Sequence, residues 1–581
     1  MKTPIAHASM RAKSLLLAAT FLTTSVLVAP AFAQLERQTG IADPGRAQQR
    51  LQEQLSTPQV TPNVSVSAAG LANAPAGAEN VRFKFGGLKI EGATAYDSNA
   101  LGSLYQDKIG TEISLADVYT IANNMTLKYR NDGYLLTQVV VPPQTIEGGI
   151  AKVRIVEGFI DKVVVQTSDG ESAYAVEKIK QYAGQINATK PVNVRALERQ
   201  LLLISDLPGV TARSVISPSE KTPGAADLLI IVERKQADAA LSFDTYGSRY
   251  LGPVQFGAAG TINSWFGLNE AITAQMVVAP GFDNFELGFG SLRYEMPVGL
   301  RGTKVAVTGS VTDTTPGFDL KQFDVEGRSE QLSIQATHPF IRGRSTNLTG
   351  RTQLDMRMVQ SENNVEDTRQ DDLRILRAGL QYQFLDRLLG IGANVVDAEF
   401  SKGINVLGAS QKDDPNMTRA LADPQFFKMN LEAQRLQRIT DNVNLLVEAR
   451  AQIANDALPS SEEFGIGGIS SVRGFDPSEV AGDDGVSGRV EAQWKQPWAL
   501  GSTFVESYQL YSFLDAGRVW NDDNTTAATA RDTLAGAGAG VRFDFVSDVE
   551  GGLALGFPLN RDPQTQNDRS PKIYMNLNKK F

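Results

Sequence analysis

The sequence predicts an exported protein in which two small α+β domains precede a large transmembrane β-barrel. The first indication is the N-terminus, where a short apolar run follows basic residues. The second is a β-α-α-β-β succession that occurs twice within residues 81–235. The third is residues 236–581, where apolar and polar side chains alternate, as they do in strands with one wet face and one apolar face.

Length and composition restrict the class of protein. A chain of 581 residues is too long for one small core, so two or more domains are expected. Cysteine is absent, which excludes disulfides, thiolate metal sites and a thiol nucleophile, and suits an oxidising compartment. The net charge of -9 and the pI near 5.2 argue against a nucleic-acid binder.

Residues 1–33 have the features of a secretory signal peptide. Basic residues precede the apolar run over residues 15–28, and Ala31 and Ala33 form a small-x-small cleavage site. A membrane anchor is the alternative, but the run is shorter than the roughly 20 residues that a spanning helix needs. No later stretch is apolar for long enough either. The mature chain is therefore expected to be exported without a membrane helix.

Residues 34–56 form a polar segment with one predicted helix. Asp43 precedes a proline, a favourable start for a helix, and Leu51 and Leu55 share one face. The remaining positions are mostly polar, so this helix either lies in solvent or occupies a polar cavity. Residues 57–80 carry turn-forming residues and are predicted to be a flexible linker.

Residues 81–158 and 159–235 are predicted to be two copies of one α+β unit. Each copy begins with a strand, continues through two helical stretches and ends with two strands, so the pair forms a repeat. The expected helices cover residues 98–108, 114–131, 173–183 and 194–204, and the expected strands cover residues 81–91, 135–141, 152–156, 160–166, 211–217 and 227–232.

Residues 236–581 are predicted to form the barrel. Val305, Val307 and Val311 interleave with polar side chains, and the same alternation recurs along the segment. At about 20 residues for each strand and its loop, the segment holds about 16–18 strands, of which about 9–11 residues each are needed to cross a membrane. A soluble sandwich could also alternate in this way. The export signal and the terminal aromatic residue Phe581 favour a bacterial outer-membrane barrel.

Two short motifs in the second half of the barrel are predicted to meet. Their residues are Val472, Arg473, Gly474 and Phe475 in the first and Phe513, Asp515 and Gly517 in the second. The permanently charged fork of Arg473 needs a carboxylate if it is held away from bulk water. Asp515 alternates with apolar Leu514 and Ala516, so it is expected to point inward and to pair with Arg473. A solvated surface turn is the alternative.

Further motifs occur in a fixed order along the chain. They are residues 129–134 (YRNDGY), Pro143-Gln144 with Val156-Glu157-Gly158, Leu207-Pro208-Gly209-Val210, residues 244–250 (DTYGSRY) and residues 294–299 (YEMPVG), followed by the two motifs above. With these motifs the whole mature chain resembles the TpsB transporters of two-partner secretion, in the superfamily that includes the barrel-assembly protein BamA. The tandem units resemble two POTRA domains.

The resemblance implies an architecture and a function. It implies a barrel of sixteen antiparallel strands in the outer membrane, POTRA domains in the periplasm, and an N-terminal helix that plugs the pore. It also implies that an exported partner protein, large and commonly β-helical, binds the POTRA domains and crosses the barrel unfolded. Membrane lipid, periplasmic chaperones and the barrel-assembly machinery are the other implied partners.

Residues 135–141 are the candidate contact for that partner. An unfolded segment can add to an exposed strand edge through main-chain hydrogen bonds, which require little side-chain specificity. The residues expected at this edge are Leu135, Thr137, Val139 and Val141. An interior strand is the alternative interpretation.

The sequence predicts neither an enzyme nor a cofactor or metal site. The two histidines are His7, within the signal peptide, and His338, and the chain has no nucleophile elbow, zinc-protease motif or phosphate-binding loop. Two alternatives to the transporter remain open. A general barrel-assembly insertase belongs to the same superfamily, and a passive porin would need neither the periplasmic domains nor the arginine-bearing loop.

Overall fold

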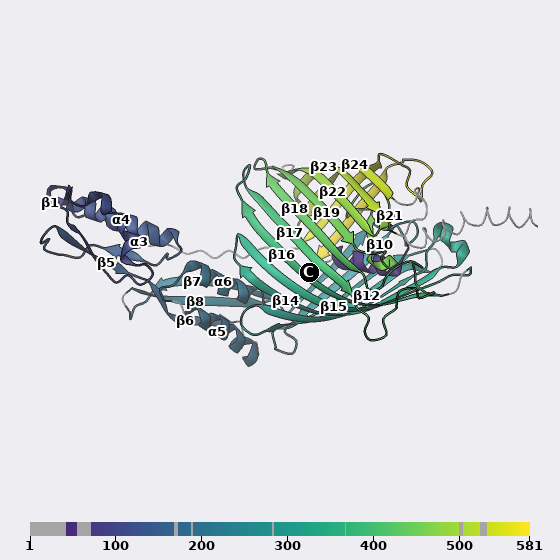
Figure 1. Cartoon of the computed structure of the whole chain (residues 1–581), viewed down its shortest axis with the longest axis horizontal. Helices are drawn as coiled ribbons and strands as arrows, with labels where there is room; N and C mark the ends of the chain where they lie inside the picture. The colour runs from purple at the N-terminus through teal and green to yellow at the C-terminus, as the bar shows by residue number, and fades with distance from the viewer. Residues whose placement is uncertain are drawn as a thin grey trace, which may run out of the picture.

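The computed structural model describes residues 42–54, 71–167, 172–187, 190–222, 224–281, 284–365, 368–498, 504–522 and 531–581. Two small α+β units extend from one end of a large barrel (Figure 1). The predicted signal peptide and the greater part of the predicted linker lie outside the described residues. Within the described ranges, no helix is both long and apolar enough to cross a membrane.

The first unit has a three-stranded sheet in the order β2-β5-β4, with β2 parallel and β4 antiparallel to β5. Helix α4 packs its buried face against this sheet, and Ser114 and Asp117 form a capping box at its start. The bounds are β1 Arg82–Lys84, β2 Gly87–Glu91, α3 Ser98–Gly102, β3 Glu112–Ser114, α4 Leu115–Asn131, β4 Gln138–Val140 and β5 Ile150–Val156, with 3₁₀ turns η1 Ala78–Asn80 and η2 Gln106–Lys108.

Three elements of this unit differ from the sequence prediction. The helix expected over residues 98–108 is divided into α3 and the 3₁₀ turn η2. The strand expected over residues 81–91 is divided into β1 and β2 at Gly86 and Gly87, where Gly87 has a φ of +141°. The strand expected over residues 135–141 is shortened to β4, because a turn occupies its first residues and Pro142 and Pro143 follow it.

The second unit repeats the plan of the first. Its sheet has the order β6-β8-β7, with β6 parallel and β7 antiparallel to β8. Helices α5 and α6 pack against it through a continuous apolar core. The bounds are β6 Phe159–Thr167, α5 Ala173–Asn187, α6 Val194–Ser205, β7 Val210–Pro218 and β8 Ala225–Arg234.

Sixteen antiparallel strands form a closed barrel, as the fold prediction requires. Strand β9 closes it by pairing with both β10 and β26. The bounds are β9 Ala237–Asp244, β10 Gln255–Asn263, β11 Ala271–Pro280, β12 Phe285–Val298, β13 Thr303–Thr314, β14 Glu326–Arg342, β15 Thr346–Glu362, β16 Arg369–Asp386, β17 Gly392–Gly403, β18 Phe427–Arg438, β19 Val443–Ala454, β22 Asp484–Pro497, β23 Val505–Trp520, β24 Arg531–Phe545, β25 Val549–Pro558 and β26 Lys572–Lys580, with η3 Phe318–Phe323 in a loop.

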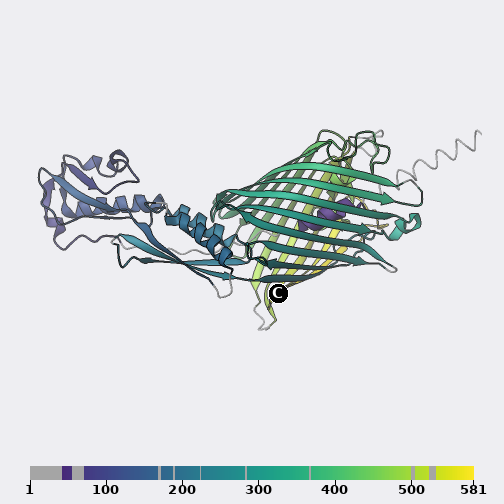
Figure 2. The same cartoon turned by 90° about the horizontal axis from the view of Figure 1, so that it is seen from below.

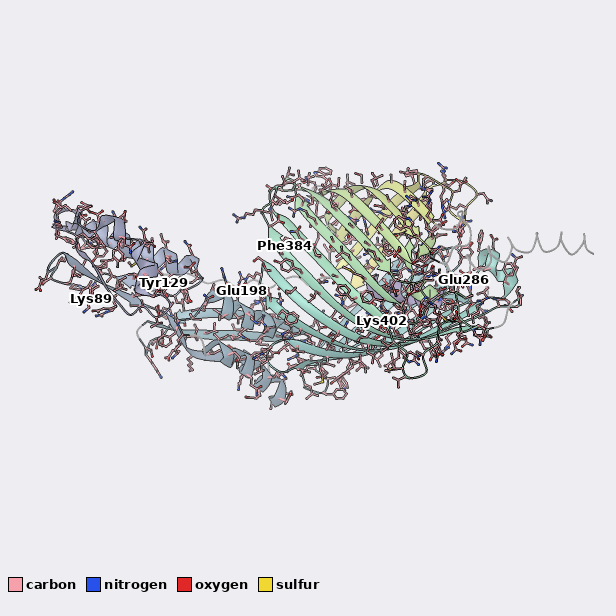
Figure 3. The ribbon with its side chains drawn as sticks, in the orientation of Figure 1. Lys89, Tyr129, Glu198, Glu286, Phe384 and Lys402 are labelled. Carbon is pink, nitrogen blue, oxygen red and sulfur yellow. The ribbon has the colours of Figure 1, made fainter. Side chains whose placement is uncertain are left out.

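The second unit is attached to one end of the barrel. Arg342, at the end of β14, donates two hydrogen bonds to Asp206 at 2.8 and 2.7 Å. Arg344 pairs with Glu198 of α6 at 2.6 Å, and Figure 3 labels Glu198 beside the barrel. The last residues of β14 lie beside the second unit. The first residues of β14 and of β16 therefore lie toward the opposite, external end of the barrel.

Helix α2 (Pro44–Gln54) lies inside the barrel (Figure 2). Its Ala47 and Leu51 pack with buried apolar side chains of the wall and loops, including Tyr250 and Leu287. Its Gln48 donates to Ser310 and accepts from Ser329, both on lumen-facing positions of the wall. A helix with few apolar positions is accommodated because the cavity is polar, and the predicted pore plug is confirmed.

Candidate functional site

The loop between β19 and β22 folds back into the barrel. It contains η4 (Ser460–Glu462) and a short hairpin of β20 (Phe464–Ile466) and β21 (Val480–Gly482). Val472 and Phe475 are fully buried and pack with Ile466, Val519 and Leu534, so the loop contacts the wall strands β23 and β24. These apolar contacts bring Arg473 into the interior.

Arg473 is held by two carboxylates. Its Nε and Nη2 donate to Asp515 at 2.7 and 2.8 Å, and its Nη1 donates to Glu491 at 2.6 Å. Its backbone N–H also donates to Asp515, at 3.1 Å. The three side chains are at most 1% exposed. The structure thus places Arg473 beside the carboxylate that the sequence assigns to it, and a charge-assisted fork of this kind is a strong contact.

Glu491 is the partner that the sequence analysis missed. Its second oxygen accepts from Arg542 at 2.8 Å, so two arginines and two carboxylates balance one another. The alternation of Glu491 with Val490 and Ala492 on β22 was the available signal, because it turns Glu491 inward. Alternation alone could not show which strand the folded loop reaches.

Phe513 covers one side of the arginine. The guanidinium carbon of Arg473 lies 3.5 Å from the centre of the Phe513 ring, a cation–π contact that contributes about 2 kcal/mol in a desolvated site. Gly517 lies beside the loop hairpin, where a Cβ would approach the Ile466 side chain to 3.2 Å. Phe513 and Gly517 of the second motif therefore both lie against the folded loop. We name Arg473, Asp515, Glu491 and Phe513 the loop lock.

Gly474 occupies a position that other residues rarely adopt. Its φ is +103°, and a Cβ there would lie 2.9 Å from the backbone of Phe557 and Pro558. Its N–H donates to the Tyr574 hydroxyl at 2.9 Å, and the same hydroxyl donates to the Phe475 carbonyl at 3.2 Å. The close backbone contact at Gly474 and these hydrogen bonds thus connect the loop to strands β25 and β26.

A second anchor holds the start of the loop. Glu462 of η4 accepts from Arg357 at 2.9 Å and from Arg377 at 2.7 Å, and it pairs with Lys428 at 2.8 Å. Glu462 is fully buried, and all three cations belong to wall strands. Sequence analysis gave no indication of this cluster, because its members come from four segments without a common motif.

The plug helix is attached to the same loop. Arg46 of α2 donates to the Ser460 carbonyl at 2.6 Å and forms an ion pair with Glu463. Gly45 lies so close to Ser461 that a Cβ there would be 2.6 Å from the Ser461 Cβ. The loop therefore contacts the wall on one side and the plug on the other.

The first-unit motifs form a separate structural cluster. The Tyr129 hydroxyl donates to Glu157 at 2.8 Å, and Figure 3 labels Tyr129 in this unit. Burial raises the pKa of Glu157, but hydrogen bonds from Ala95 and Thr94 outweigh it and hold the pKa below the usual range. The Gln144 amide donates to the Lys152 carbonyl at 2.8 Å and so continues the pairing of the β5 edge.

The edge strand predicted within residues 135–141 is present as β4, and its contact with a partner stays a prediction. Within the described residues β4 pairs with β5 alone and is an edge strand. However, its Val139 N–H donates to the Thr126 hydroxyl of α4 at 3.1 Å. Thr137 and Val139 are buried, and Leu135 and Val141 are half-buried. Strand alternation thus turns these side chains toward the core of the unit and away from a partner.

The remaining predicted site residue is Phe581, which ends the last strand. Its N–H donates to the Ala239 carbonyl of β9 at 2.9 Å, and its ring is exposed at the end of the barrel nearest the α+β units. In the part of the chain that the structure describes, no group of acidic or histidine side chains is arranged to hold a metal ion.

Comparisons with known proteins identify the family. The model described as haemolysin secretion/activation protein ShlB/FhaC/HecB matches residues 225–543, and the ShlB-type POTRA domain matches residues 83–158. The heme/hemopexin transporter protein HuxB of Haemophilus influenzae (strain 86-028NP) is 23% identical over 502 residues, which cover 83% of this chain and 84% of the relative. The outer membrane transporter CdiB of Escherichia coli is 22% identical over 542 residues, 90% of this chain and 86% of the relative.

A solved structure shows that the fold is shared. CdiB from Escherichia coli superposes with a TM-score of 0.71 at 21% identity, covering 92% of this chain and 98% of that chain. The first family match spans more than half of the 581 residues. With its POTRA-type units, closed barrel and inward-folded loop, the chain belongs to the ShlB/FhaC/HecB family, the outer-membrane transporters of two-partner secretion.

Proposed function

We propose that the exported partner first adds to the edge of strand β7 in the second POTRA domain. β7 has nine residues and, within the described residues, pairs with β8 alone. Its Val215 is 53% exposed, whereas Val139 of β4 is buried. Main-chain pairing along such an edge accepts many sequences, as an unfolded cargo requires. β7 therefore supports partner binding better than residues 135–141 do.

A photo-crosslinking residue at Val215 should capture one exported protein in growing cells. The same residue at Val164, an exposed apolar position on the other edge strand β6, is the matched control and should give no adduct. Equal adducts at both positions would contradict the assignment to β7. Adducts with many barrel precursors at Val215 would instead support the insertase alternative.

The plug helix is the part that leaves the pore when cargo passes. Gln48 of α2 contacts the wall through neutral hydrogen bonds with Ser310 and Ser329, each contributing about 0.5–1.5 kcal/mol, and Arg46 pairs with Glu463 of the loop. The loop is held by the buried groups around Arg473 and Glu462, and breaking one such pair costs about 3–5 kcal/mol. This difference in attachment is the observation that carries the proposal. A passive porin would need neither a plug helix that can leave nor a loop fixed to the wall.

The cargo then crosses as an extended chain and folds outside the cell. The chain carries no phosphate-binding loop, so the driving free energy comes from folding of the partner, a large β-helical exoprotein. Chaperones and the barrel-assembly machinery act earlier, when the transporter itself reaches the membrane.

Gly474→Val should abolish export while leaving the barrel in the membrane. Valine at a φ of +103° costs about 1–3 kcal/mol, and its Cβ meets the backbone of Phe557 at 2.9 Å. Export is measured as partner in the medium, and folding as the shifted band of an unheated sample on a gel. Gly488→Ala on β22 is the control, because the nearest atom there is 3.6 Å from the new Cβ. Normal export by a folded Gly474→Val variant would refute this role.

A further inference from the structure

A groove of about 690 Å³ lies in the wall of the barrel over strands β12 to β16. Asp372 and Arg374 line it, whereas Leu373 between them does not and is buried. Since side chains alternate along a strand, the groove and the lumen are on opposite sides of the wall. The groove therefore opens toward the membrane.

Two glycines form the floor of this groove. Gly309 lies next to Ser310, whose hydroxyl accepts from the plug helix inside the lumen, so Gly309 faces outward. A Cβ at Gly309 would meet no atom within 4 Å, and one at Gly290 would meet only Val311, at 3.9 Å. The absence of side chains here leaves a hollow, and the apolar side chains around it are Leu292, Val311, Leu332, Met356 and Met358.

The groove is charged on its β16 side and apolar on its β12 and β13 side. Glu330, Asp372 and Arg374 line it near the first residues of β14 and β16, which lie toward the external end of the barrel. Met356 pairs with both Arg374 and Leu332, and Leu332 pairs with Gly309, so the lining becomes apolar from β16 toward β13. A headgroup followed by an acyl chain has the same order of polarity.

Among the described residues, Arg374 and Asp372 are the charged groups of the groove that form no ion pair. Glu330 already accepts from Arg328 at 2.8 Å, and Asp372 accepts from Gln370 at 2.6 Å. Arg374 donates to the carbonyls of Leu373 and Leu407, and its Nε is buried without a hydrogen-bond partner. None of the ion pairs among the described residues includes Arg374. A guanidinium that forms no ion pair can donate charge-assisted hydrogen bonds to a phosphate.

We propose that this groove binds one phosphate-bearing lipid of the external monolayer. The acyl chain lies over Gly290 and Gly309, and the phosphate accepts hydrogen bonds from Arg374. The occupant is a lipid and not a soluble molecule, because the groove is continuous with the membrane-facing surface of the barrel. The site is independent of cargo export.

The test uses the full chain in vesicles of phosphatidylcholine that contain phosphatidylglycerol with a diazirine in its acyl chain. Illumination should label the wild-type protein at peptides of β13 to β15. Gly309→Leu, whose Cβ would meet no atom within 4 Å, should lower this labelling to the level of wall positions outside the groove. Gly288→Leu is the matched control, because Gly288 has the same outward direction on β12 and open space around it but does not line the groove. Undiminished labelling of Gly309→Leu would overturn the site.

The phosphate contact is tested separately. In the wild type, diazirine phosphatidylglycerol should label the groove more strongly than diazirine diacylglycerol, which lacks the phosphate. Arg374→Gln should lower this preference about tenfold, the effect of losing one charge-assisted hydrogen bond. Lys402→Gln, which removes an exposed cation on β17 outside the groove (labelled in Figure 3), should leave the preference unchanged. Equal labelling by both lipids in the wild type would overturn phosphate recognition.

Discussion

Arg473→Ala is expected to leave a folded barrel in the outer membrane and to reduce export of the partner protein to background. The substitution leaves Asp515 and Glu491 buried, with one of their two arginines removed. Such a loss costs about 3–5 kcal/mol, which the loop avoids by releasing from the wall. The sixteen paired strands do not depend on this contact, so the barrel persists. A released loop fills the lumen that the plug helix vacates, and cargo cannot pass.

The measurement pairs two readouts on the same cells. Partner protein in the medium reports export, and the shifted band of an unheated sample reports the folded barrel. Lys495→Ala is the matched control, since it removes an exposed pair with Asp544 at 2.7 Å, and exposed pairs contribute less than about 1 kcal/mol. Arg473→Lys should restore export only in part, because an ammonium cannot reproduce the two-carboxylate fork. Wild-type export by Arg473→Ala would refute the loop lock.

Strand periodicity made most of the fold predictable. Alternation of apolar and polar residues identified the barrel, and the position of Asp515 between Leu514 and Ala516 placed its side chain inward before its partner was known. Helices were predicted at residues 114–131 and 194–204 of the two α+β units, and the structure has α4 and α6 there. Strand alternation and helix position depend on residues that are close together in the sequence, so a single sequence is enough to predict them.

The features that sequence patterns did not predict depend on contacts between segments that are distant in the sequence. Glu491 and Glu462 were missed because a loop whose path no periodicity describes brings Arg473 to Glu491 and brings Glu462 to its cations on the wall. The β4 edge was predicted, but periodicity could not show that its Val139 N–H is taken by the Thr126 hydroxyl of a helix. In each case the deciding contact is a hydrogen bond or ion pair between two polar groups that the fold brings together. Sequence spacing does not predict such a pair.

A disulfide between cysteines at positions 45 and 461 should stop export under oxidising conditions and restore it on reduction. The chain has no cysteine of its own, so Gly45→Cys together with Ser461→Cys can form only this bridge. A Cβ at Gly45 would lie 2.6 Å from the Ser461 Cβ, and a disulfide needs about 3.8 Å, so the end of α2 must shift by about 1 Å. The bridge fixes the plug helix to a loop that stays in place, so the helix cannot leave the pore.

Each single-cysteine variant is the control for the bridged protein and should export normally in both redox conditions. Dithiothreitol should return the double variant to the level of these controls within the same culture, which separates a trapped plug from a misfolded barrel. Export by the fully oxidised protein at the control level would show that cargo passes with the helix in place. The weaker attachment of α2 would then have no part in opening, and the path of the cargo would have to lie beside the plug.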